Sequence, residues 1–146
     1  MIVQIDPLLA EAIQRAAGVS YPHECCGLLT GEKSGNNVII TGVHQSENVT
    51  SGDPTRGFEV DPKLRFDLMR MFESLGDGTE IIGHYHSHPD HPAEPSATDL
   101  SMAYETDFIW LICASSKVGG GNMGAFRPKS DRSDFETLEL SIEQII

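Results

Sequence analysis

Four of the six histidines of this chain fall between residues 84 and 91, in the segment Gly83-His-Tyr-His-Ser-His-Pro-Asp-His91. On a β-strand, His84, His86 and His88 would all point to one face of the sheet. Residues two apart on a strand are separated by about 7 Å, so their imidazoles can share one metal ion, whereas residues four apart, at about 13 Å, cannot. The strand therefore offers either His84 with His86, or His86 with His88, as a ligand pair.

Asp99 is the candidate third ligand. The prolines at 89, 92 and 95 forbid a regular helix after the histidines, so the chain can turn back on itself. A helix that begins near Ser96 would then present Asp99 in its first turn. Two imidazoles and one carboxylate leave a fourth position open for water, which is the pattern of catalytic zinc, and imidazole ligands favour zinc over magnesium.

The segment Ser96-Ala-Thr-Asp99 also fits a simpler interpretation. A serine followed three residues later by an acid is typical of a helix capping box, in which each side chain bonds the other residue's backbone. An HxH pair can likewise be a pair of surface residues, and we expect His91 and Glu94 to be solvated.

The elements that must position these residues alternate between helix and strand. Apolar spacing predicts helices over residues 7–17, ending at Gly18, over 62–75, ending at Gly76, and over 96–104. Short apolar runs predict strands at 26–30, 38–43, 58–60, 80–88, 108–114, 123–126 and 135–142, with a turn at 34–37, a loop over 44–57 and a flexible glycine turn at 119–121. The fold class is therefore mixed α/β, a single-domain mixed sheet flanked by helices.

Composition excludes several classes of protein. With 22 acidic and 10 basic residues, the net charge of −12 argues against nucleic-acid binding and against an anionic membrane surface. The longest apolar run, residues 108–114, is far shorter than the roughly 20 residues of a membrane span. No signal peptide is expected, so we predict a cytoplasmic protein. The three cysteines, Cys25, Cys26 and Cys113, are expected to be buried small apolar residues. Separately, open edges of the predicted sheet favour a homodimer.

The pattern His86-x-His88-x7-Ser96-x2-Asp99 resembles the signature of the JAMM, or MPN-plus, zinc metalloproteases. The upstream segment Tyr21-Pro-His-Glu-Cys-Cys-Gly-Leu-Leu-Thr-Gly31 resembles the family's glutamate-bearing segment, with Glu24 in the expected place. The resemblance covers nearly the whole chain and implies one JAMM/MPN-plus domain over 1–146, with a cytidine-deaminase-like α-β-α architecture.

The resemblance implies a role for each matching residue. His86, His88 and Asp99 would bind one zinc ion with a catalytic water, and the capping role of Asp99 would then give way. Glu24 would be the general base and acid, and Ser96 would stabilise the oxyanion. The residues alone do not select Glu24, because Glu80 and Glu94 are nearer in sequence.

Small members of the family resemble peptidases and isopeptidases that cut after the C-terminal Gly-Gly of a ubiquitin-like protein, in bacteria mainly a sulphur carrier. Such a tail would fit a narrow groove and could add as a strand at the sheet edge. One alternative is a non-catalytic interaction module of the MPN type. A zinc deaminase is a second alternative, but its HxE and PCxxC signature is absent.

Overall fold

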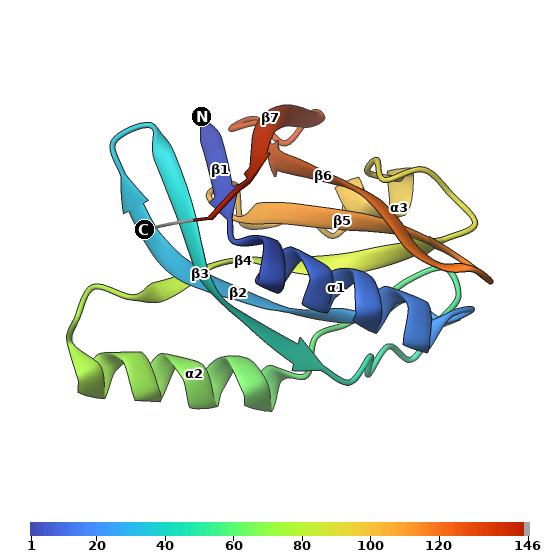
Figure 1. Ribbon diagram of the computed structural model, residues 1–146, viewed down its shortest axis with the longest axis horizontal. Helices are drawn as coiled ribbons and strands as arrows, with labels where there is room; N and C mark the ends of the chain where they lie inside the picture. Colours follow the sequence, from blue (N-terminus) through green and yellow to red (C-terminus); the bar gives the residue numbers. More distant parts are fainter. Residues whose placement is uncertain (145–146) are drawn as a thin grey trace.

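The computed structural model describes residues 1–144, which form a mixed α/β fold as predicted (Figure 1). The helices are α1 (Pro7–Ser20), α2 (Pro62–Leu75) and α3 (Ala97–Ser101). The strands are β1 (Ile2–Ile5), β2 (Cys26–Ser34), β3 (Asn37–Ser46), β4 (Glu80–Pro89), β5 (Ile109–Ser116), β6 (Gly119–Pro128) and β7 (Phe135–Ile142). A single domain over 1–146 stays a prediction, because residues 145–146 lie outside the described part.

The strands form one mixed sheet in the order β1-β3-β2-β4-β5-β6-β7, and the sheet closes on itself. The short β1 closes it by pairing in parallel with both β3 and β7. Our expectation of open sheet edges was therefore wrong for residues 1–144, because each strand has two neighbours there. The argument for a homodimer from open edges is lost with it, as is the idea that a substrate tail joins a free edge strand.

Helix α1 begins where the sequence indicates. The Asp6 carboxylate accepts a hydrogen bond from the Leu8 amide at 2.9 Å, and Pro7 occupies the first helical position. The helix does not end at Gly18, however, but continues to Ser20. A Cβ on Gly18 would lie 3.2 Å from the Cα of Gly119, so this glycine permits close packing and does not terminate the helix.

The glycines at 119–121 are part of β6 and do not form the flexible turn that we expected. A Cβ on Gly120 would lie only 2.3 Å from the carbonyl oxygen of Gln14, and the Gln14 side-chain amide donates to the Gly121 carbonyl at 3.0 Å. The glycines therefore let α1 cross directly over β6, which a larger residue would prevent.

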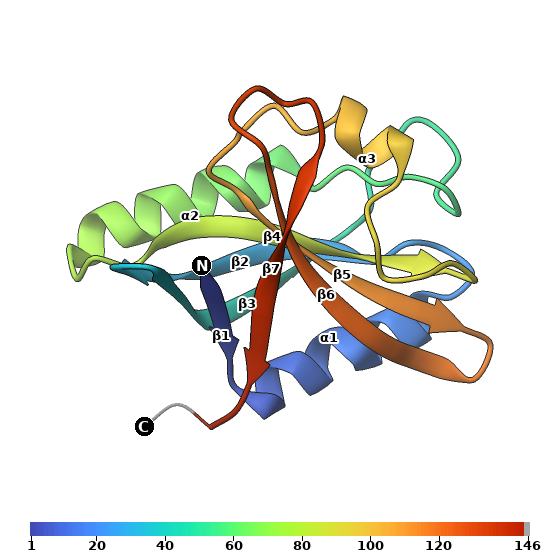
Figure 2. The ribbon, with the colours of Figure 1, turned by 90° about the horizontal axis from the view of Figure 1, so that it is seen from above.

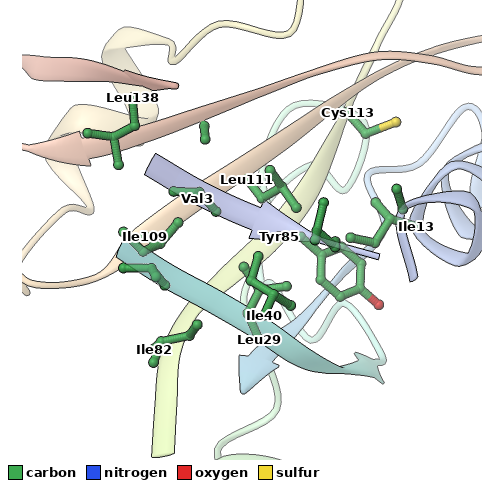
Figure 3. Close-up of a cluster of buried hydrophobic side chains, with 14 of the residues drawn as sticks. Val3, Ile13, Leu29, Ile40, Ile82, Tyr85, Ile109, Leu111, Cys113 and Leu138 are labelled. Carbon is green, nitrogen blue, oxygen red and sulfur yellow. The ribbon is translucent and has the colours of Figure 1, made fainter. Parts of the chain in front are cut away.

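The main apolar core fills the space between α1 and the sheet. Figure 3 shows Ile13 of α1 together with Tyr85, Leu111 and other inward side chains of the strands. Cys25, Cys26 and Cys113 are buried and free, as expected. The side chains of β4 on the face covered by α1 are buried in this core. The alternate side chains of β4 therefore point to the opposite face of the sheet.

Helix α2 lies on the opposite side of β2 and β4 from α1 (Figure 2). It begins after Asp61, whose carboxylate accepts from the Lys63 amide at 3.0 Å, and ends at Gly76, as predicted. The second apolar cluster also lies on this side of the sheet and includes Trp110 and Ile112 of β5. This is the side that carries the histidines.

The remaining differences lie at element ends. Residues 2–5, to which we assigned no element, form β1, and β2 and β3 run further toward their turn, whose Gly35 has a φ of +60°. Of the expected strand at 58–60, only Val60 takes part, in an isolated bridge to Asn48. The third helix ends at Ser101 instead of Tyr104. No helix in the described residues is both long and apolar enough to cross a membrane.

Candidate metal centre and active site

Strand β4 places His86 and His88 on the face away from α1. A bulge near Ile82 sets this register, so that Ile82 and Tyr85 enter the main core while His86 faces Trp110. The Nε2 atoms of His86 and His88 lie 3.1 Å apart, and both residues are buried. The alternation expected of a strand therefore holds, and it produces a converging pair of imidazoles.

Asp99 comes to the same point from α3. Its Oδ1 lies 3.3 Å from His86 Nε2, and its Oδ2 lies 3.0 Å from His88 Nε2. The capping box forms at the same time: Ser96 N–H donates to Asp99 Oδ2 at 2.9 Å, and Asp99 N–H donates to Ser96 Oγ at 3.1 Å. The expectation that capping gives way was therefore wrong, because the cap holds Asp99 in place against the histidines.

The three side chains can hold a metal ion. Their ligand atoms all lie within 4.8 Å of one another, and all three residues are buried. A tetrahedral ion with bonds of about 2.0–2.1 Å separates its ligand atoms by about 3.3 Å, close to the observed spacings. A buried carboxylate and two imidazoles all point at one position. A divalent cation suits that position better than an apolar side chain would.

A backbone carbonyl fixes the orientation of one imidazole. His88 Nδ1 lies 3.0 Å from the Pro92 carbonyl oxygen, which can only accept, so Nδ1 carries a proton and Nε2 is the ring nitrogen that faces Asp99. The His86 ring is held differently, by the Phe58 ring stacked on it at 4.2 Å between centroids. Both supports lie outside the predicted set. Phe58 was detectable as an isolated aromatic residue after a polar loop, but no sequence signal marks the Pro92 carbonyl.

His84 lies on the same face but outside the cluster. Its ring packs edge-on against Trp110 at 4.3 Å, and its centroid is 6.2 Å from that of His86. Burial lowers the pKa of His84 to about 3, so it is neutral at pH 7. Of the two ligand pairs that the residues left open, the structure brings His86 and His88 to Asp99.

Glu24 is held beside the cluster by its backbone. Its N–H donates to the Pro54 carbonyl at 2.7 Å, and its carbonyl accepts from the Asn48 side-chain amide at 3.2 Å. The next residue, Cys25, donates its N–H to Ser87 Oγ at 2.8 Å, which ties the start of β2 to β4. The sequence gives no sign of the Asn48 and Ser87 contacts.

The Glu24 carboxyl group is buried, with 6% of the residue exposed, and its Oε1 has no hydrogen-bond partner among the described residues. Burial raises the pKa of Glu24 to about 7, with a further upward contribution from Asp99 and an opposing one from His88. A carboxyl group with a pKa near 7 can both accept and release a proton at neutral pH.

A cleft of about 450 Å³ brings the predicted residues together. Glu24, His88 and Ser96 line it, and His86 and Asp99 are buried next to it. His91 and Glu94 are exposed on its rim, as expected for solvated residues. The cleft therefore joins a candidate base, a candidate metal site and a hydroxyl group in one place.

Comparison with known proteins agrees with this geometry. The model of the family described as prokaryotic homologs of the JAB domain matches residues 7–128. The chain belongs to this family. The resemblance to the JAMM/MPN family that the sequence indicated is thus confirmed.

Two kinds of relative support the placement. A Haloferax volcanii protein named Desampylase is 34% identical over 138 residues, covering 94% of this chain and 91% of that protein. A solved structure from Desulfitobacterium hafniense superposes with a TM-score of 0.82 at 24% identity, covering 99% of this chain and 94% of that one. A JAB1/MPN domain protein from Archaeoglobus fulgidus gives a TM-score of 0.60 at 20% identity, covering 97% and 99%.

Within this JAB domain, the two segments that carry the site are far apart in sequence. Glu24 precedes β2, whereas the histidines end β4 and Asp99 follows them in α3. The antiparallel pairing of β2 with β4 sets Cys26 opposite His86, and this register brings Glu24 to the histidines. The JAB fold thus brings Glu24 next to the histidines through two adjacent strands, and the loops after β3 and β4 complete the cleft.

Proposed function

We propose that this protein is a zinc-dependent peptidase or isopeptidase that hydrolyses the bond after the C-terminal Gly-Gly of a ubiquitin-like protein, with a sulphur carrier as the expected substrate. The observation that supports it is the convergence of His86, His88 and Asp99 beside the buried Glu24 carboxyl group. Membership of the JAB family and the similarity to a protein named Desampylase favour the same activity. We keep a cytoplasmic location as part of the proposal.

In this proposal, His86, His88 and Asp99 hold one zinc ion. Zinc bound there supplies a Lewis acid that lowers the pKa of a bound water to about 7. The Pro92 carbonyl keeps the His88 lone pair directed at the site, and the cap formed with Ser96 keeps the Asp99 carboxylate there.

Glu24 performs the proton transfers. Its carboxylate accepts a proton from the attacking water and then delivers that proton to the leaving amine as the C–N bond breaks. Without a metal ion, burial raises the pKa of Glu24 to about 7. A bound zinc ion would lower it, which favours the carboxylate form that takes the proton from water. Its fixed backbone, held by Pro54 and Asn48, keeps the carboxyl group at the cleft wall.

Ser96 donates to the oxygen that becomes negative when the carbonyl carbon turns tetrahedral. Its Oγ already accepts from the Asp99 amide, which orients the hydroxyl group, and its own hydrogen has no acceptor among residues 1–144. That hydrogen is therefore available to the substrate oxygen. Such a donor contributes about a hundred- to a thousandfold to the rate.

The test is cleavage of a ubiquitin-like protein fused through Gly-Gly to a small reporter peptide. Protein loaded with zinc should release the reporter after the second glycine, as identified by intact mass. Glu24→Gln should keep its zinc, measured by elemental mass spectrometry, but lose cleavage. A fusion ending in Ala-Ala is the matched substrate control.

Cleavage by Glu24→Gln at the wild-type rate would contradict the mechanism. Tight binding of the fusion without any cleavage by the zinc-loaded protein would instead favour the non-catalytic interaction module. A wild-type protein that takes up no zinc would remove the metal centre from the proposal.

A further inference from the structure

The cleft contains a positively charged side chain, that of Arg56, which the proposed mechanism does not use. Arg56 lines the same cleft as Glu24 and His88, and it is the only lysine or arginine among residues 1–144 that does so. Its side chain is exposed and makes no hydrogen bond or ion pair with any described residue. Most arginines of this acidic chain are paired or stacked, such as Arg65 with Glu105.

The loop that carries Arg56 is fixed next to Glu24. Pro54 accepts the Glu24 N–H, and the Asn48 side-chain amide donates both to the Glu24 carbonyl and to the Gly57 carbonyl, at 3.2 and 3.0 Å. Between these anchors, Arg56 N–H donates to the Asp53 carbonyl at 3.1 Å. The backbone on both sides of Arg56 is therefore attached to the segment that carries the general base.

The shared cleft indicates which part of a substrate Arg56 can meet. Glu24 delivers its proton to the leaving amine, so the leaving group enters the cleft that both Glu24 and Arg56 line. If the leaving group is a single amino acid, its α-carboxylate is only two bonds from that amine. Glu24 and Glu94, the acidic residues that line the cleft, would repel this carboxylate, and a guanidinium group at the cleft wall offsets that repulsion.

We infer that Arg56 is a specificity residue that binds the free α-carboxylate of the leaving residue. It would make the protein favour release of a single C-terminal residue attached after Gly-Gly over cleavage of a lysine isopeptide, whose leaving group has no carboxylate at that place. The inference rests on the proposed function, because it assumes that Glu24 protonates the leaving amine.

The test uses two fluorescent ten-residue peptides without acidic side chains, both ending Gly-Gly-Ala, one as the free acid and one as the carboxamide. Wild-type protein loaded with zinc should cleave the acid with a kcat/KM roughly tenfold above that of the amide. Arg56→Ala should reduce cleavage of the acid to the level of the amide and leave the amide unchanged. Arg56→Lys should keep part of the preference, because it retains the charge but not the two-pronged contact.

Binding provides a readout that needs no turnover. In the Glu24→Gln background, fluorescence anisotropy should show tighter binding of the acid than of the amide, and Arg56→Ala should remove the difference. Lys33→Ala is the matched control, because Lys33 is an exposed cation on β2 outside the cleft, and it should change neither peptide.

Equal binding and cleavage of acid and amide by the wild-type protein would overturn the inference, as would a preference that survives Arg56→Ala. If Arg56→Ala weakens binding and cleavage only of peptides to which a glutamate has been added, Arg56 binds an acidic side chain of the substrate and the inference is wrong. Absence of both binding and cleavage also overturns it. Preferential binding of the acid without cleavage would retain the role of Arg56 and remove the proposed peptidase activity.

Discussion

Replacing Glu24 by glutamine should stabilise the metal-free protein at alkaline pH. The Glu24 carboxyl group is buried, and its Oε1 has no hydrogen-bond partner among the described residues. Ionising such a group in the folded protein costs free energy that the unfolded chain does not lose. Glutamine has nearly the same shape but carries no charge, so the variant avoids this cost.

The pKa of Glu24 gives the size and the sign of the effect. It is about 7 in the folded protein, against an ordinary value of 4.5. Between these values the folded state holds a proton that the unfolded state has released, so wild-type stability falls as pH rises from about 4.5 to 7. The shift corresponds to at most about 3 kcal/mol. Because the carboxyl group borders an open cleft, we expect about 1–2 kcal/mol after solvent screening.

The measurement is urea unfolding of wild type and Glu24→Gln, both stripped of metal with a chelator, at pH 4.5 and pH 8. The variant should be more stable by about 1–2 kcal/mol at pH 8, and the difference should vanish near pH 4.5. Groups common to both proteins cancel in this difference. An equal or lower stability of the variant at pH 8 would refute the assignment of Glu24 as a buried carboxyl group with a raised pKa.

Three further predictions test the site and the fold. His88→Ala should reduce bound zinc from about one per chain to near zero by elemental mass spectrometry, because it removes one of three ligands. Ser96→Ala should lower the cleavage rate about a hundred- to a thousandfold and the free energy of unfolding by about 1 kcal/mol. If only the stability falls, Ser96 acts as a helix cap and has no role in catalysis. Gly120→Ala should cost about 1–3 kcal/mol in urea unfolding, because its Cβ would meet the Gln14 carbonyl at 2.3 Å. Gly52→Ala should be neutral, because its Cβ would have only an ordinary contact with Thr50 Oγ1 at 3.7 Å.

The secondary structure of the site could be predicted because local signals determine it. Alternating histidines on a run from Glu80 predict a strand, and the structure has β4 there. The pairs Asp6-Pro7 and Asp61-Pro62 predict helix starts, and both helices begin there. These signals act within a few residues, so the sequence carries them directly.

Contacts between distant segments could not be predicted in this way. The alternation of β1 spans only four residues, and its place depends on pairing with both β3 and β7. Gly119–Gly121 have the composition of a turn, but the approach of α1 requires them to be in a strand. Glu24 illustrates the same limit, since only its pairing partner β4 makes it a neighbour of the histidines.

Asp99 shows why the two interpretations of the Ser96–Asp99 segment were not alternatives. A carboxylate has two oxygens, each with two acceptor directions. Oδ2 accepts the Ser96 amide proton and still lies 3.0 Å from His88 Nε2, while Oδ1 lies near His86 Nε2. The cap therefore holds Asp99 in position before any ion binds. A ligand that is already fixed loses little conformational freedom on metal binding, so the capping box contributes to the metal centre and does not compete with it.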